Sequence, residues 1–234
     1  MTICDAYYSY DGKSIELKID YCEFPDDLLY DLSNGTWGRP DSGTLRVGIT
    51  NLLSWPSGTF SVVTFKGVGT SLLRGQVAGS VEGPMHFDVV RTPVSGVILR
   101  TNEVLKQDPR LLNKDPYGSG WFMEVEMKNP TELLLMQKLP EAREQIAARL
   151  RELRVHCFAE FPDHEMFEIG VECSAVLVKL NNLLDQNSSG TVVHVVSDDN
   201  SAPIEMERWS DQTGNRVLES RREGNLYHFI AKKT

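Results

Sequence analysis

Cys173 is the residue whose type and position best suit chemistry in this chain. It follows Gly170-Val171-Glu172, where the strand-like "HEMFEIG" gives way to the amphipathic "SAVLVKLNNLLDQ". At the start of a helix, unpaired N–H groups and the positive end of the helix dipole favour a thiolate. The Glu172 carboxylate opposes this, because a like charge raises the pKa of a thiol. The residues therefore predict at most a mildly activated thiol, and a buried cysteine that packs as a small apolar side chain is the alternative.

The other three cysteines are Cys4, Cys22 and Cys157. No pair has C-x-x-C spacing and no cysteine–histidine group has zinc-finger spacing, so we expect no metal site. In a reducing cytoplasm all four cysteines are expected to be free thiols. A thiol redox protein that uses Cys157 and Cys173 is a weaker hypothesis, since the two do not form a close sequence pair.

A second feature is the stretch "VEGPMHFDVVRTPVSG", residues 81–96. Gly83-Pro84 and the later "PVSG" are turn signals around a β-branched strand. Turn tips of this kind are exposed and often carry function. The tip holds Met85, which is either a gap-filling apolar side chain or, together with Phe87, a docking point for a partner.

Composition limits the class of protein. The chain has 234 residues and a net charge of −9, from 24 Lys+Arg and 33 Asp+Glu. This excess of negative charge disfavours nucleic acid as a partner, because phosphate binding needs a basic patch. No apolar run is long enough to cross a membrane, and "MTICDAYYSYDGK" lacks the pattern of a signal peptide. We therefore expect a cytoplasmic protein that binds neither nucleic acid nor membrane.

Two regions of different pattern must position these residues. Residues 44–127 hold short β-like pieces separated by glycine, which predicts a compact sandwich or barrel. A helix is predicted over residues 140–153, with Pro140 in its first turn. The remaining residues have the order βαβαββ, which predicts a two-layer α/β sandwich. The fold class is thus α+β with two domains, 1–154 and 155–234, and "FPDHE" (161–165) is expected to be an exposed linker.

Four stretches of the first domain resemble the glycine-cleavage H protein: "TLRVGIT" (44–50), "GVGTSLLRGQVAGSVE" (67–82), "TPVSGVILRTNEVL" (92–105) and "NKDPYGSGWFMEVE" (113–126). The resemblance implies a lipoyl-type β-barrel-sandwich hybrid in which a lysine at a hairpin tip carries lipoic acid. Counting back from "PVSG", that position falls on Met85, which has no primary amine for an amide bond. Since no lysine lies between Lys66 and Lys106, we expect no lipoyl cofactor and no glycine-cleavage activity of its own.

The second domain resembles the TusA-like family of small sulfur carriers. The matching stretches are "FEIGVECSAVLVKLNNLL" (167–184) and "GTVVHVVSDDNSAPIEMERW" (190–209), followed by a closing hairpin. That family is marked by Cys-Pro-x-Pro after Gly-x-x. Gly170 and Cys173 match the mark, whereas Ser174 and Val176 stand in place of its prolines. The resemblance implies that Cys173 is the carrier thiol.

These features together predict a cytoplasmic sulfur-relay protein. Cys173 would hold persulfide sulfur, and the H-protein-like domain, without lipoate, would serve for docking. The expected partners are proteins of sulfur transfer, such as a cysteine desulfurase or another sulfurtransferase, and no cofactor is expected. Whether the chain is an enzyme of the sulfurtransferase class is open. The alternative is a non-catalytic adaptor in which both domains have lost their chemistry.

Overall fold

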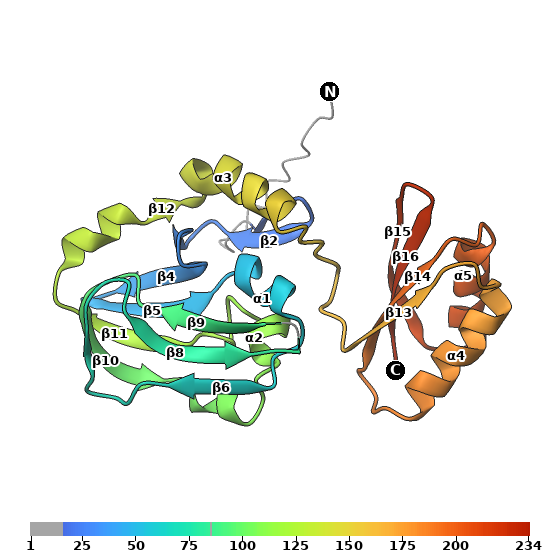
Figure 1. Ribbon diagram of the computed structural model, residues 1–234, viewed down its shortest axis with the longest axis horizontal. Helices are drawn as coiled ribbons and strands as arrows, with labels where there is room; N and C mark the ends of the chain where they lie inside the picture. Colours follow the sequence, from blue (N-terminus) through green and yellow to red (C-terminus); the bar gives the residue numbers. More distant parts are fainter. Residues whose placement is uncertain (1–15, 85) are drawn as a thin grey trace. The chain divides into compact units, whose positions relative to one another are not determined.

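The computed structural model describes residues 16–84 and 86–234, and the chain divides into two compact units, Met1–Cys157 and Phe158–Thr234 (Figure 1). The predicted boundary at 154/155 lies slightly earlier, because Val155 and Cys157 pack into the core of the first unit. In the described part of the chain, no helix is long and apolar enough to cross a membrane.

The first unit is built on a seven-stranded sheet of order β12-β3-β4-β5-β11-β10-β7. Its strands are β3 (Leu29–Asp31), β4 (Thr36–Asp41), β5 (Thr44–Ile49), β7 (Ser71–Leu72), β10 (Gly96–Thr101), β11 (Met123–Met127) and β12 (Gln137–Lys138). The smaller sheets are β6 (Val62–Phe65), β8 (Val77–Glu82) and β9 (Phe87–Arg91), and the pair β1 (Glu16–Ile19) and β2 (Cys22–Pro25). The helices are α1 (Asn51–Ser57), η1 (Glu103–Lys106), α2 (Leu111–Lys114), η2 (Pro130–Leu135) and α3 (Leu139–Glu152).

Alternation along the strands of the large sheet gives it two buried faces. Leu45 and Val47 of β5 point to one face, where they pack with Val81 and Val90 of the three-stranded sheet. The opposite face carries Trp37 of β4. The first unit is therefore a β-sandwich whose large sheet is also covered on its second face.

Trp37 covers that second face by lying over the glycine opposite to it. Trp37 and Gly48 are cross-strand partners in β4 and β5. A Cβ atom at Gly48 would overlap the indole ring, so only glycine leaves room for it. The indole is fully buried, and its N–H donates to the Pro116 carbonyl at 3.0 Å.

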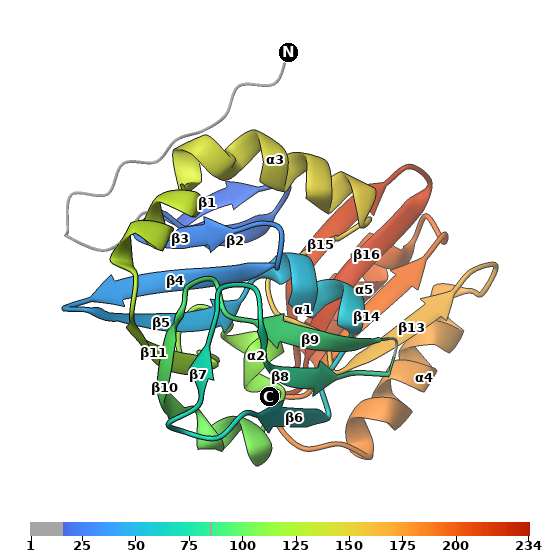
Figure 2. The same ribbon diagram turned by 60° about the vertical axis from the view of Figure 1, so that its left-hand side comes forward.

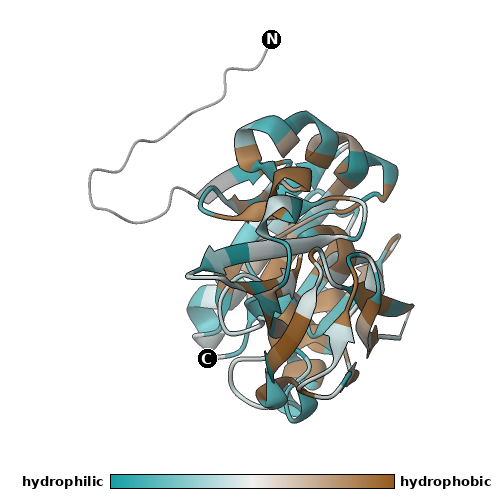
Figure 3. Cartoon of the chain, turned by 90° about the vertical axis from the view of Figure 1, so that its left-hand side faces the viewer, coloured by the Kyte–Doolittle hydropathy of each residue, from teal (hydrophilic) through white to brown (hydrophobic). Residues whose placement is uncertain are grey.

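Helix α3 packs on this face, alongside β1 and β3 (Figure 2). Pro140 lies in its first turn, and its buried stripe consists of Leu139, Ala142, Ile146 and Leu150. This one-sided pattern is visible as alternating hydrophobic and hydrophilic colour along the helix in Figure 3. The helix is thus amphipathic, with its apolar side turned toward the sheet.

The prediction of four free thiols is wrong for two of the cysteines. Cys22 in β2 and Cys157 after α3 form a disulfide across a sequence separation of 135 residues. Both side chains are buried in the cluster that α3 closes. The packing of α3 brings distant parts of the chain together, which cysteine spacing in the sequence does not reveal. Cys173 is free, and Cys4 lies outside the described residues.

The second unit has a four-stranded sheet of order β13-β14-β16-β15. Its elements follow the chain as β13 (His164–Glu168), α4 (Cys173–Asp185), β14 (Val192–Ser197), α5 (Ala202–Thr213), β15 (Arg216–Glu223) and β16 (Leu226–Lys232). Strands β13 and β14 are parallel, whereas the other pairs are antiparallel. Val193 and Val195 of β14 pack with Leu180 of α4 and Met206 of α5, so one face of the sheet is covered by both helices.

The expectation of an exposed linker at "FPDHE" is also wrong. Phe161 is buried. Asp163 is bonded to β14 twice: its N–H donates to the Val192 carbonyl at 2.8 Å, and its carboxylate accepts from the Val192 N–H at 3.0 Å. These bonds make the segment part of the second unit.

We predict that Gly48→Ala destabilises the first unit, because the added methyl group must displace the buried Trp37 ring. Overpacking of this kind costs about 1–3 kcal/mol. Gly67→Ala is the matched control, since a Cβ there meets no atom within 4 Å. Urea unfolding of both variants gives the comparison, and equal midpoints would contradict the packing argument.

Candidate functional site

Cys173 lies where β13 passes into α4. The strand ends at Glu168, and the helix begins with Cys173 itself. The turn between them contains Gly170 at φ 71°, in the left-handed region that favours glycine. The Gly170 N–H donates to the Asp198 carboxylate at 2.8 Å, which holds the turn against the loop after β14.

A carboxylate from the loop after β14 lies at the N-terminus of this helix. Asp199 accepts the N–H of Cys173 at 2.8 Å through one oxygen. Its other oxygen accepts the N–H and the hydroxyl of Ser201, at 2.8 and 2.9 Å. The N–H bonds from Ser201 and Cys173 lower the pKa of Asp199, so it carries its charge at neutral pH. The positive end of the helix therefore already has a counter-ion.

The thiol of Cys173 is unsuited to ionise in this setting. Cys173 is 2% exposed, and its side chain packs in the core that α4 and α5 form with the sheet. Burial, and then the carboxylates of Asp199 and Glu205, raises its pKa to about 11. At pH 7 only about one thiol in ten thousand would be ionised. The mild activation expected from the helix start is thus reversed by burial and by carboxylates distant in sequence.

The hairpin predicted to carry Met85 is formed by β8 and β9. The two strands are antiparallel, and their last pair is Glu82 with Phe87. The Gly83 N–H donates to the His86 carbonyl at 3.0 Å and closes the turn. Met85 lies outside the described residues, so its predicted place at the tip stays a prediction. Phe87, the first residue of β9, is 62% exposed.

A cavity that the sequence did not reveal lies next to this hairpin. It has a volume of about 360 Å³, the size of a site for a small molecule. The β9 residues Asp88 and Arg91 line it, together with Arg149 of α3 and the apolar side chains of Leu52 and Pro56. The Asp88 carboxylate also accepts the Ser57 hydroxyl at 3.1 Å. The lining residues come from the β8–β9 turn, β9, α1, α3 with the residue after it, and the turn before β4, so no local motif marks the cavity.

The structure assigns the predicted site residues to different units. Cys173 belongs to the second unit, and the β8–β9 hairpin belongs to the first. Sequence analysis missed Asp199, although "SDDN" after a buried strand is rich in residues that cap helices. Within residues 16–84 and 86–234, no group of three or more His, Cys, Asp or Glu side chains could hold a metal ion.

Comparisons with known proteins match the first unit. Residues 28–149 match the family described as "Glycine cleavage H-protein". The "Glycine cleavage system H protein 5" of Aquifex aeolicus is 31% identical over 119 residues, which are 49% of this chain and 80% of that protein. The "Probable glycine cleavage system H protein 2" of Saccharolobus solfataricus is 34% identical over 115 residues, 48% of this chain and 78% of that protein. A solved glycine cleavage system H protein from Mycobacterium marinum is 28% identical, covers 53% of this chain and 98% of its own, and has a TM-score of 0.47.

We predict that Asp199→Asn lowers the pKa of Cys173, because one of the two carboxylates that oppose thiolate formation is removed. The pKa should stay above that of an ordinary thiol, since burial is the larger cause and is unchanged. The pH dependence of Cys173 alkylation by iodoacetamide, mapped by peptide mass spectrometry, measures the shift.

Asp211→Asn is the control for this measurement, because it removes the same charge from an exposed position of α5. It should leave the alkylation profile of Cys173 unchanged. An unchanged profile for Asp199→Asn as well would contradict the role given to Asp199.

Proposed function

The chain belongs to the glycine cleavage H-protein family through residues 28–149, and from this premise we propose that it is a non-catalytic adaptor. In this proposal both units bind partners, and neither carries out the chemistry of the family that it resembles. The burial of Cys173, with its raised pKa, is the observation that carries the proposal.

The first unit supports the proposal through its hairpin. No lysine lies between Lys66 and Lys106, so neither β8, β9 nor the turn between them offers a primary amine. An amide bond to lipoate needs such an amine. The unit therefore has the sandwich and the hairpin but no lysine for lipoate attachment. The resemblance implies that such a lysine would stand at the position of Met85.

The second unit supports the proposal through the surroundings of its cysteine. A sulfur carrier needs a thiol that a donor protein can reach and that ionises near neutral pH. Cys173 is 2% exposed, and Asp199 holds its backbone N–H. Persulfide formation would require the first turn of α4 to open, at the loss of this hydrogen bond and of core packing.

Exposed apolar side chains on both units offer surfaces for protein partners. Phe87 on β9 is 62% exposed in the first unit. In the second unit, Phe167 of β13 and the adjacent Ile169 are 64% and 52% exposed. β13 is also an edge strand, bonded on one side to β14. Exposed aromatic residues beside an unpaired strand edge are typical of protein-binding surfaces.

A sulfur relay through Cys173 is the second candidate. It is favoured by the position of Gly170 and Cys173 at the strand-to-helix turn, where the TusA-like resemblance expects a carrier cysteine. Its expected partners are a cysteine desulfurase or another sulfurtransferase. Ser174 and Val176, in place of the prolines of that family, count against it.

Incubation with a cysteine desulfurase and cysteine, and separately with lipoate and a lipoate ligase, decides between the two candidates. We expect peptide mass spectrometry to find no persulfide on Cys173 and no lipoyl group on residues 81–96. Cys173→Ser and a lipoyl-lysine H protein are the negative and positive controls. Persulfide on Cys173 that passes to an acceptor would overturn the adaptor proposal in favour of the relay.

A further inference from the structure

The sheet of the second unit has two edge strands, β13 and β15, and they differ in how well they are protected against pairing with another chain. Within the described residues, β13 pairs with β14 and β15 pairs with β16. Arg and Glu side chains follow each other along β15, and its register shifts between Val217 and Glu219. Charged side chains and bulges are the features by which natural edge strands avoid pairing with other chains.

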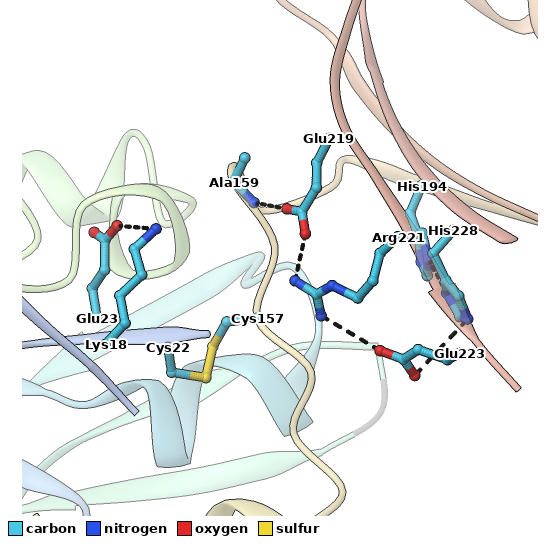
Figure 4. A network of polar contacts seen from close by, with 10 residues as sticks. All are labelled: Lys18, Cys22, Glu23, Cys157, Ala159, His194, Glu219, Arg221, Glu223 and His228. Atoms are coloured by element: carbon cyan, nitrogen blue, oxygen red, sulfur yellow. Dashed lines mark hydrogen bonds and ion pairs between the residues drawn. A yellow bond between two sulfur atoms is a disulfide. The ribbon is translucent and has the colours of Figure 1, made fainter. Parts of the chain in front are cut away.

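The charged side chains of β15 bind one another. Figure 4 shows the Arg221 guanidinium between the carboxylates of Glu219 and Glu223, to both of which it donates hydrogen bonds. The Arg221 side chain is 10% exposed. A strand added to this edge would place its side chains beside charged groups that already satisfy one another. β15 is therefore poorly suited to bind a further strand.

The edge formed by β13 has neither kind of protection. Its five residues pair with β14 without a shift in register. Alternate N–H and C=O groups of an edge strand point away from its neighbour and can pair with another chain. The Phe167 side chain of β13 is 64% exposed, and Ile169 just after the strand is 52% exposed. An added strand would therefore find both backbone partners and apolar surface at this edge.

One charged group lies beside this apolar surface. The Glu165 side chain is 56% exposed, and its carboxylate lies 3.5 Å from Nδ1 of His194. Hydrogen bonding to His194 lowers the pKa of Glu165, so the carboxylate is charged at neutral pH. Glu165 and Phe167 are two residues apart and therefore point to the same face of the sheet. On the opposite face, Glu168 already binds the Lys179 ammonium group at 2.6 Å.

The charge of the whole second unit also bears on the partner. Phe158–Thr234 contains 13 Asp+Glu and 7 Lys+Arg. This excess of negative charge attracts a positively charged partner. It repels a second copy of the same unit. Charge complementarity at this edge therefore favours a basic segment of another protein over self-pairing.

We propose that β13 binds an extended, basic segment of a partner protein, which joins the sheet as an additional strand. The segment carries Lys or Arg beside Glu165 and an apolar residue two positions away beside Phe167, because side chains on one face repeat every two residues. Backbone hydrogen bonds supply affinity in this mode of binding, and the side-chain pairs supply sequence preference. The proposal names a partner class for the second unit and rests on the proposed adaptor function.

The test is an NMR titration of the full-length protein with the peptide acetyl-Thr-Val-Thr-Lys-Thr-Val-Thr-amide. Its valines lie two positions from the lysine on both sides, so it fits either strand direction. The control, acetyl-Val-Thr-Thr-Lys-Thr-Thr-Val-amide, has the same composition but places lysine and valine on opposite faces. We expect the first peptide to shift the β13 amide signals and to slow the exchange of the N–H groups that point away from β14. The control should bind about fivefold more weakly.

Variants assign the two side-chain contacts. Phe167→Asp should abolish binding of the first peptide, because it removes the apolar contact and adds a charge at the edge. Glu165→Lys should instead bind the peptide that has glutamate in place of lysine, and this reversal shows that the variant is folded. Val178→Asp is the matched control, because Val178 is 58% exposed but lies on α4. It should bind the first peptide as the wild type does.

Three results would overturn the proposal: equal affinity for the two peptides, signal changes confined to residues outside β13, or a dimer formed through β13 in sedimentation without peptide. The adaptor proposal is tested separately by the search for persulfide and lipoyl groups. Persulfide transfer from Cys173 would overturn the adaptor and leave the peptide result unchanged. Failure of the peptide to bind would overturn the added strand and leave the chemical tests of the adaptor unchanged.

Discussion

The packing of Trp37 onto Gly48 is the constraint on which the first unit depends. A side chain at Gly48 would hold the indole away from the sheet, and protein interiors do not tolerate the resulting void. The buried indole forms part of the surface on which α3 lays its apolar stripe. The position of α3 in turn decides where the chain emerges after Val155, and therefore that Cys157 meets Cys22. One steric requirement in the sheet thus leads to the covalent bond next to the domain boundary.

In the second unit, the same contacts that complete the fold oppose ionisation of the Cys173 thiol. The first N–H groups of a helix need acceptors, and Asp199 supplies one for Cys173. The carboxylate that satisfies the backbone also disfavours a negative charge on the sulfur. A sulfur carrier would need this end of α4 to be open and electropositive. Burial and the Asp199 carboxylate instead keep the thiol of Cys173 protonated, which suits a structural cysteine. This opposition is the physical basis for preferring an adaptor over a sulfur relay.

Local patterns in the sequence predicted the elements well. The helix predicted over 140–153 is α3, Leu139–Glu152, because its apolar spacing and Pro140 are local signals. The predicted strand-to-helix turn at Gly170 is present for the same reason. The disulfide, the cavity beside β9 and the effect of Asp199 on Cys173 were missed, since each joins residues from separate elements.

The prediction of an exposed linker at "FPDHE" is wrong because residue type alone does not show that Asp163 pairs with Val192 of a neighbouring strand. The disulfide also bears on the predicted compartment. Such bonds are typical of oxidising environments, and in a reducing cytoplasm they are usually transient and redox-sensing. Cytoplasmic localisation therefore stays a prediction.

Titration of the Cβ carbon-13 chemical shift of Cys173 shows directly whether this residue is a structural thiol. Selective cysteine labelling of the Cys4→Ser variant leaves Cys173 as the remaining thiol once the disulfide has formed. If Cys173 is a structural thiol, its Cβ signal stays at the thiol position through neutral pH and changes with a midpoint near pH 11. A midpoint below about pH 8, the range of activated cysteines, would contradict it.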